Sequence, residues 1–287
     1  MVWYFMEKKL WWLIIFCLAA LGWWFHSVFS GEVILSQVIN LGIFQIRYYG
    51  LVLAAAIILA YVFALHRRIK FNIATPQAEK IIFYAIIGGF IGARLYHVFS
   101  EPMYYVSNPL EILAVWHGGL GIYGAIVGGV VGSWLASRTQ LKLLKVLDWL
   151  VPSVLIGQMI GRLGNFFNYE LFGYPTNFPW KMFVPEKFRS IEFTNSIFFH
   201  PLFLYESLAS LGILGILLYF EPKFKSSGSL FLWYVLLYNI VRFSLEFLRI
   251  DSEFIGVFRQ NALMSLLLVI GSGIIILYVR TRKVSQN

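Results

Sequence analysis

Long apolar runs separated by short polar connections repeat along the whole chain. Each run is long enough to cross a bilayer core of about 30 Å as a helix. They cover approximately residues 10–29, 47–65, 81–99, 112–135, 149–166, 201–220, 230–247 and 261–278. We therefore predict an all-α, polytopic transmembrane helix bundle, with seven core spans and one extra N-terminal span.

Composition supports a membrane protein. Of the 287 residues, 59% are hydrophobic and 13% are charged, whereas about a quarter of the residues of a soluble domain are charged. Residues 1–29 resemble a signal sequence, but Trp23, Trp24, Phe25 and His26 stand where small residues would precede cleavage. We expect residues 1–29 to be an uncleaved anchor and residues 30–287 to form the main membrane domain.

The basic residues orient this bundle. Alternate connections, beginning with the N-terminus, hold fourteen Lys and Arg, and the opposite set holds six. The positive-inside rule then places both termini in the cytoplasm and the longest polar segment, 167–199, outside as a small extracytoplasmic head. The net charge of +9 fits anionic lipid headgroups, and no motif indicates nucleic acid.

Other common classes of site find little support in the sequence. Cys17 is the only cysteine, so it allows neither an internal disulfide nor a thiolate metal cluster. There is no Walker or dinucleotide motif. We expect no metal and no cofactor.

Glycines recur at helical spacing. Residues 88 and 92, 124, 128 and 132, and 157 and 161 are four apart, which favours close helix packing in a membrane. Residues 117–124 are too glycine-dense for an ordinary helix start. Two interpretations stay open there: irregular backbone that lines a cavity, or further packing glycines.

Three arginines, Arg94, Arg162 and Arg242, lie inside apolar runs. A cation at membrane depth is costly and usually faces a cavity with a partner or a function. Arg162 and Asn165 share a helix face, and a guanidinium there can hold a phosphodiester through paired hydrogen bonds. The alternative for Arg162 is an internal salt bridge, for instance with Glu170.

The seventh span carries a polar stripe. Tyr238, Arg242 and Glu246 are four apart and therefore stack along one face. The arginine and glutamate of this stripe can neutralise each other, but the neighbouring tyrosine favours a wall that faces a ligand. His200, Tyr205 and Glu206 lie at the start of the sixth span, and a structural role for His200 alone is the more common case.

Over about residues 42–250, these segments together resemble the bacterial prolipoprotein diacylglyceryl transferase family. The resemblance rests on Arg47-Tyr48-Tyr49-Gly50-Leu51, the run at 88–94, the glycines of 118–129, Gly161-Arg162-Leu163-Gly164-Asn165-Phe166 with Glu170 and Gly173, His200-Pro201 with Leu204-Tyr205-Glu206, and Arg242-Phe243 with Glu246-Phe247 and Arg249. The Gly-Arg-x-Gly-Asn-Phe motif is the most specific of them.

The resemblance implies a reaction and a location. The diacylglyceryl group of phosphatidylglycerol would pass to the lipobox cysteine of a preprolipoprotein signal peptide, giving a thioether and glycerol phosphate. The enzyme would be a multi-pass protein of the bacterial cytoplasmic (inner) membrane, with its site toward the outer side.

The resemblance also implies residue roles. Arg162 and Arg242 would stabilise the departing phosphate. The same site would be lined by Asn165, Glu170, Gly173, Tyr49, Tyr238 and Glu246, with Arg94 and His200 among the lipid-binding residues and Arg249 at the outer edge.

One position departs from the family pattern. Many members carry a histidine, a proposed general base, where this chain has Tyr123. The pKa of tyrosine, near ~10, makes it a poor base at neutral pH. Tyr123 then acts by hydrogen bonding, or the proton of the substrate thiol goes elsewhere, to Glu246 or to water.

Two other classes of function remain alternatives. A transporter or channel for an organic anion also uses buried arginines and broken helices, but it predicts internal repeats, and the two halves of the chain show no convincing repeat. A different lipid-headgroup enzyme would normally carry paired carboxylates or a histidine pair, and neither forms a compact motif.

Overall fold

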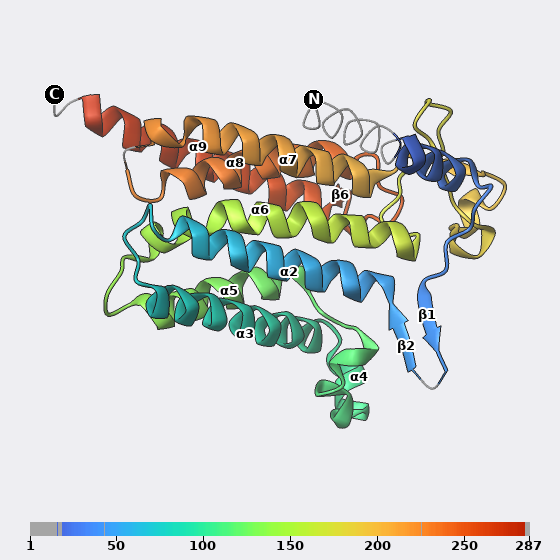
Figure 1. The fold of residues 1–287 in the computed structure, drawn as a ribbon, viewed down its shortest axis with the longest axis horizontal. Helices are drawn as coiled ribbons and strands as arrows, with labels where there is room; N and C mark the ends of the chain where they lie inside the picture. Colours follow the sequence, from blue (N-terminus) through green and yellow to red (C-terminus); the bar gives the residue numbers. More distant parts are fainter. Residues whose placement is uncertain (1–15, 17–18, 43, 225, 285–287) are drawn as a thin grey trace, which may run out of the picture. The chain divides into compact units, whose positions relative to one another are not determined.

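The computed structural model describes residues 16, 19–42, 44–224 and 226–284, and helices dominate it (Figure 1). The α-helices are α2 (Tyr48–Arg67), α3 (Thr75–Ser100), α4 (Pro102–Ser107), α5 (Ile122–Ser137), α6 (Leu143–Asn168), α7 (Leu202–Phe220), α8 (Ser229–Glu246) and α9 (Gln260–Val284). Short 3₁₀ turns are η1 (Pro109–Ile112), η2 (Val115–His117), η3 (Glu186–Phe188), η4 (Ile191–Phe193) and η5 (Glu221–Lys223).

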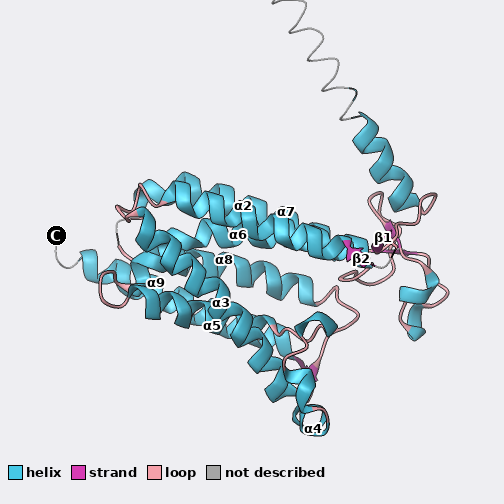
Figure 2. Cartoon of the chain, turned by 60° about the horizontal axis from the view of Figure 1, so that its bottom comes forward, coloured by secondary structure: helices cyan, strands magenta, loops and turns pink. Residues whose placement is uncertain are grey.

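Strands occur only as short antiparallel pairs in the described residues (Figure 2). β1 (Val38–Leu41) pairs with β2 (Phe44–Arg47), β3 (Met182–Phe183) with β4 (Phe198–Phe199), and β5 (Phe254–Ile255) with β6 (Phe258–Arg259). Each pair lies in a connection between helices.

Among the described residues, five helices are long and apolar enough to cross a membrane: α2, α3, α6, α7 with η5, and the Gln260–Val279 part of α9. This confirms a helical membrane protein. α5 is apolar but shorter. The fourth span was predicted to begin near residue 112, and this was wrong: residues 109–121 form η1, η2 and a glycine turn, and α5 begins at Ile122. Of the first predicted span, 10–29, residues 10–15, 17 and 18 lie outside the described residues, and residues 19–29 are helical.

The chain divides into two compact units, and five helices contribute residues to both. One unit comprises the described residues of Met1–Ala55, Gln158–Ser210 and Tyr238–Val269, and the other those of Ala56–Gly157, Leu211–Leu237 and Ile270–Asn287. We call them the first and the second unit and describe each by itself.

In the second unit, α3 and α5 lie side by side (Figures 1 and 2). Their glycines explain the closeness of the contact. A Cβ added at Gly92 would collide with the carbonyl oxygen of Gly124 and lie 2.9 Å from the Cα of Gly128. For the glycines of α3 and α5 the predicted packing role is thereby confirmed, because backbone meets backbone and leaves no room for a side chain. The same prediction for Gly161 was wrong, because a Cβ there would meet nothing within 4 Å.

Two buried polar side chains of α6, those of Asp148 and Trp149, are paired with backbone groups in the second unit. The indole Nε1 of Trp149 donates to the carbonyl of Ala64 at 2.9 Å. Asp148, from α6, accepts the backbone N–H groups of Gly228 at 2.5 Å and Phe231 at 2.9 Å. These donors lie at the start of α8, where backbone N–H groups have no partner within the helix, so Asp148 caps α8.

The first unit has its own hydrophobic core. Buried Met182, Val184 and Phe199 of the 167–199 segment and its boundary pack with Phe166 of α6 and Phe203 of α7. The segment is therefore a folded structure anchored on two helices. This arrangement fixes the end of α6, which carries the specific sequence motif.

The α3–α5 contact generates a first prediction. Gly92→Ala should lower the free energy of unfolding by about 1–3 kcal/mol, as overpacking does in a close-packed interior, because the obstructing atoms belong to the backbone. Thermal unfolding of the detergent-solubilised protein measures the effect. Gly215→Ala on α7 is the matched control, since a Cβ there meets nothing within 4 Å. Equal melting temperatures for the two variants would contradict the prediction.

Candidate active site

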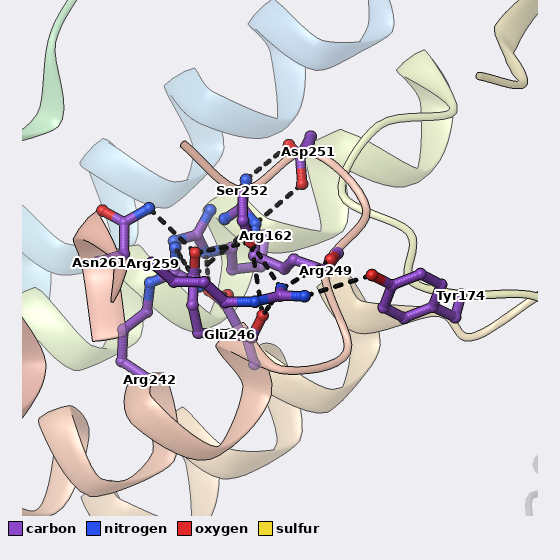
Figure 3. A network of polar contacts seen from close by, with 10 residues as sticks. Arg162, Tyr174, Arg242, Glu246, Arg249, Asp251, Ser252, Arg259 and Asn261 are labelled. Atoms are coloured by element: carbon purple, nitrogen blue, oxygen red, sulfur yellow. Dashed lines mark hydrogen bonds and ion pairs between the residues drawn. The ribbon is translucent and has the colours of Figure 1, made fainter. Parts of the chain in front are cut away.

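A chain of ion pairs joins three helices in the first unit. Glu206 of α7 lies 2.6 Å from Nε of Arg162 on α6 and 3.3 Å from an Nη of Arg242 on α8. Arg242 also pairs with Glu246, one turn further along α8, at 2.9 Å. Figure 3 shows Arg162, Arg242 and Glu246 converging in one polar network. Two of the three arginines singled out in the sequence are thus brought together by a carboxylate from a third helix.

Burial makes this pairing necessary. The side chains of Glu206 and Glu246 are 2% and 0% exposed. Removing a charge from water costs several kcal/mol, and an opposite charge with good geometry is needed to offset that cost. Because Glu206 contacts both arginines, it holds α6 and α8 in a fixed relation. The alternative partner considered for Arg162, Glu170, is not the one that it pairs with.

The C-terminal end of α8 is closed by a second layer of polar contacts. The Glu246 carboxylate accepts hydrogen bonds from the hydroxyl of Ser252 at 2.9 Å and from Nδ2 of Asn261 at 3.4 Å. Arg259 donates to the backbone carbonyls of Glu246 at 2.6 Å and Arg249 at 3.0 Å. Carbonyls at a helix C-terminus lack intrahelical partners and carry partial negative charge, so a guanidinium suits this position.

Arg249 lies beside this layer and forms a two-pronged pair with Asp251, with N–O distances of 2.9 and 2.6 Å. Burial lowers the pKa of the Arg249 guanidinium, but the hydrogen-bonded carboxylate of Asp251 more than offsets this and raises the pKa above its ordinary value. Arg249 is therefore a permanent cation at the end of α8.

Tyr49 packs against the motif on α6. A Cβ added at Gly164 would lie 2.9 Å from the Tyr49 ring, so the glycine allows the ring to rest on the helix backbone. Tyr49 and Tyr238 are both close enough to Arg162 to interact with it electrostatically. A Cβ at Gly161, by contrast, meets nothing within 4 Å, which leaves open space beside Arg162.

Asn165 and Glu170 form a local pair at the end of α6. The Asn165 Nδ2 lies 3.3 Å from one oxygen of Glu170, and the Nδ2 of Asn168 lies 3.3 Å from the other. The backbone N–H of Glu170 donates to the carbonyl of Asn165 at 3.0 Å. Glu170 is exposed, so it presents an oriented carboxylate at the surface of the site.

Gly173 and His200 belong to the join between the 167–199 segment and the helices. Gly173 forms a β-bridge with Arg249 and donates its N–H to the carbonyl of His200. The Nδ1 of His200 lies 3.0 Å from the Tyr205 hydroxyl, and Tyr205 accepts a hydrogen bond from the indole of Trp180. Burial lowers the pKa of His200, so at neutral pH the ring is uncharged.

Arg94 and Tyr123 lie in the second unit. The Arg94 guanidinium donates to the carbonyls of Gly118 at 2.6 Å and Gly119 at 2.9 Å. It also donates to those of Glu111, Ile112 and Ala114. Arg94 thus holds the glycine turn that leads into α5. The backbone of this turn is irregular, with positive φ at Gly118 and Gly119, and the cavity that it was expected to line stays a prediction. Tyr123 lies in the first turn of α5, with its ring 5.9 Å from that of Tyr96.

Several residues of the network were absent from the sequence-based site. Glu206 was noted only as part of the span-six motif, and Ser252, Arg259 and Asn261 were not singled out. Glu206 could have been predicted as a site residue, because it is a carboxylate that lies inside the apolar run 201–220. Arg259 and Asn261 had no comparable signal, because they lie in a connection and at a helix start. Within the described residues, no group of three His, Cys, Asp or Glu side chains could hold a metal ion.

The network carries an excess of positive charge. Its four arginines, Arg162, Arg242, Arg249 and Arg259, face three carboxylates, those of Glu206, Glu246 and Asp251. One guanidinium charge is left over. In a membrane-embedded setting, such an excess favours binding of a single anionic group such as a phosphodiester.

The shared carboxylate generates a second prediction. Glu206→Gln should lower the free energy of unfolding by about 3 kcal/mol, because it removes a buried charge and leaves two partly buried guanidinium groups without their common counter-ion. Chemical unfolding in detergent micelles measures the change. Glu170→Gln, the same substitution at an exposed carboxylate, is the control and should change it by less than about 0.5 kcal/mol. A Glu206 variant as stable as this control would refute the counter-ion role.

Comparison with known proteins places the chain in a family. The family profile described as prolipoprotein diacylglyceryl transferase matches residues 36–278. Among curated relatives, the phosphatidylglycerol–prolipoprotein diacylglyceryl transferase of Thermotoga petrophila is 39% identical over 249 residues, covering 85% of each chain. The transferase of Gloeobacter violaceus is 36% identical, and the match covers 87% of this chain and 94% of that protein. The transferase of Synechocystis is 37% identical, and the match covers 84% of this chain and 88% of that protein. The chain belongs to the prolipoprotein diacylglyceryl transferase family.

Proposed function

We propose that this protein transfers the diacylglyceryl group of phosphatidylglycerol to the lipobox cysteine of a preprolipoprotein. A bond forms between the cysteine sulfur and a glycerol carbon of the lipid, and the bond from that carbon to the phosphate oxygen breaks. Glycerol phosphate leaves, and the thiol proton passes to a base or to water. The observation that carries the proposal is the pair of arginines, Arg162 and Arg242, held inside the helix bundle by Glu206.

The arginines suit the leaving group. As the carbon–oxygen bond breaks, the phosphate changes from a monoanionic diester toward a more highly charged monoester. Fixed donors aimed at this developing charge lower the barrier without reorganising during the reaction. Arg162 is 29% exposed and Arg242 14%. Arg162 would make the first contact with the headgroup, and Arg242 would support it from α8.

The remaining residues are assigned by their placement. Tyr49 and Tyr238 would flank the phosphate beside Arg162, and Asn165 and Glu170 would bind hydroxyls of the glycerol headgroup. Gly173 and His200 would hold the 167–199 segment against the backbone of Arg249. Arg94 would act indirectly, by shaping the glycine turn before Tyr123.

The thiol proton needs an acceptor, because the thiolate is the competent nucleophile. Glu246 is an unfavourable acceptor, since its carboxylate already binds Arg242, Ser252 and Asn261. Tyr123 would hold a proton of its own at neutral pH. We assign Tyr123 a hydrogen-bonding role and pass the proton to water.

The orientation follows from the charge count of the connections. The connections hold fourteen against six basic residues, and the positive-inside rule then favours an outer location for the 167–199 head and the arginine network. Residues 1–29 would anchor the chain, and residues 30–287 would form the transferase domain. Both substrates reside in the bilayer, which fits a site built from membrane helices.

The assignment of the arginines is directly testable. Arg162→Ala and Arg242→Ala should each lower kcat for thioether formation by about 10²–10³-fold, the usual cost of removing a donor to a developing anion. Purified protein, phosphatidylglycerol and a lipobox peptide supply the assay, with mass spectrometry of the modified cysteine as the readout. Arg138→Ala, at an exposed arginine, is the control and should retain full activity. Full activity of both site variants would overturn the assignment, and an inactive, folded wild-type protein would favour the anion transporter.

The role of Tyr123 gives a fourth prediction. Tyr123→Phe should lower kcat by about tenfold, the value of one hydrogen bond, and should leave the shape of the pH–rate profile unchanged. The profile of peptide modification between pH 6 and about 10 provides the measurement. A loss of several orders of magnitude, or the disappearance of a basic limb from the profile, would instead make Tyr123 the base.

A further inference from the structure

The connection between α8 and α9 ends in an exposed, uncharged apolar tip. The tip consists of Phe254, Ile255, Gly256, Val257 and Phe258, and its four side chains are 59%, 57%, 85% and 62% exposed in order along the chain. Monomeric soluble surfaces rarely carry such contiguous apolar patches without a partner. The nearest charges, Glu253 and Arg259, stand at the base of the hairpin and not at its tip.

The hairpin is a defined structure. β5 and β6 pair as Phe254 with Arg259 and Ile255 with Phe258. Gly256 has a φ of 61° and is the first central residue of the two-residue turn, the position at which a tight hairpin turn needs glycine. Paired strands satisfy much of their own backbone hydrogen bonding, which reduces the cost of moving the tip out of water.

Arg259 ties the base of the hairpin to the arginine network. Besides the carbonyls at the end of α8, it contacts Oγ of Ser252 at 2.9 Å and the hydroxyl of Tyr174 at 3.2 Å. Its guanidinium also lies 5.6 Å from the ring centroid of Phe254. The contacts of Arg259, with Tyr174 labelled beside it, appear in Figure 3. The tip therefore projects from a fixed base.

The position of the tip beside a candidate membrane span indicates that lipid covers it. α9 begins at Gln260, directly after the hairpin, and its Gln260–Val279 part is one of the membrane-spanning candidates. The exposed apolar surface continues onto α9 through Leu263, Met264 and Leu267. A membrane boundary must therefore lie within a few residues of the tip, and apolar side chains without charge are favoured in the interfacial and acyl region.

We propose that the tip at residues 254–258 inserts into the bilayer interface and anchors the end of α8 in the membrane. Its partner is the lipid surface, through the acyl chains and the inner edge of the headgroup layer. Through Arg259, the depth of the tip fixes the depth of the carbonyls of Glu246 and Arg249. The inference concerns membrane contact and holds whichever reaction the arginine network performs.

Spin labelling tests the insertion on the full-length protein. A nitroxide is attached to Val257→Cys in a Cys17→Ser background, and the protein is reconstituted into vesicles of phosphatidylcholine and phosphatidylglycerol at 3:1, a ratio chosen on the order of natural anionic content. Power saturation then compares access of oxygen, which concentrates in lipid, with that of a water-soluble nickel chelate. Leu267→Cys on α9 is the lipid-facing reference. Ile191→Cys, at a side chain that is 97% exposed in the 167–199 segment, is the matched aqueous control.

The label at Val257 should resemble that at Leu267, with oxygen access severalfold higher than nickel access. The label at Ile191 should show the reverse. A Val257 label with the nickel access of Ile191 would overturn the proposal, because the tip would then lie in water. A label shielded from both reagents would also overturn it and indicate a protein partner. Dipolar broadening that disappears on dilution with unlabelled protein would identify that partner as a second copy.

Each variant is first checked for the elution volume and melting temperature of the wild type, which it should keep because the replaced side chains are exposed.

Discussion

The pairing of Glu206 with two arginines is the constraint on which the first unit depends. A carboxylate with 2% exposure cannot remain charged without partners, and Arg162 and Arg242 cannot lie among apolar helices without a counter-ion. Each group makes the burial of the others tolerable. The result is a fixed electrostatic arrangement across α6, α7 and α8, built from one residue of each helix. Rigid placement of charge is what a site for an anionic lipid requires.

Glycine and capping contacts supply the rest of the architecture in both units. In the second unit, the glycines of α3 and α5 replace side-chain packing by direct backbone contact, while Arg94 fixes the turn that precedes α5. In the first unit, Gly164 allows Tyr49 to rest on α6, and Arg259 satisfies the carbonyls at the end of α8. In both units, glycines allow a helix backbone to be contacted directly, and arginines donate hydrogen bonds to backbone carbonyls that have no partner within a helix.

The sequence predicts local features well and distant partnerships poorly. Hydropathy locates α2, α7 and α8 within two residues at each end, since a long apolar run is sufficient to define such a helix. It places the start of α3 and the end of α9 six residues too far inside the helix. It fails at residues 109–121, because apolar content alone cannot distinguish a helix from 3₁₀ turns stabilised by the Arg94 side chain. The i, i+4 spacing reveals the Arg242–Glu246 pair. It cannot reveal that Arg162 pairs with Glu206, 44 residues away in the chain, and not with nearby Glu170. That choice depends on how α6 and α7 pack, which a single sequence does not encode in any local pattern.

The resting ion pairs are compatible with anion binding because they do not exhaust the positive charge. Arg162 engages Glu206 through Nε, the inner edge of its guanidinium, and it is the more exposed of the two site arginines. Its partner carboxylate is buried, so an incoming phosphate would meet the outer face of the cation without displacing Glu206. The surplus charge of Arg259 is spread over carbonyls and hydroxyls, which orient it without neutralising it. A site organised in this way is held rigid by its carboxylates yet remains cationic, and both properties are needed to bind a membrane lipid through its phosphate.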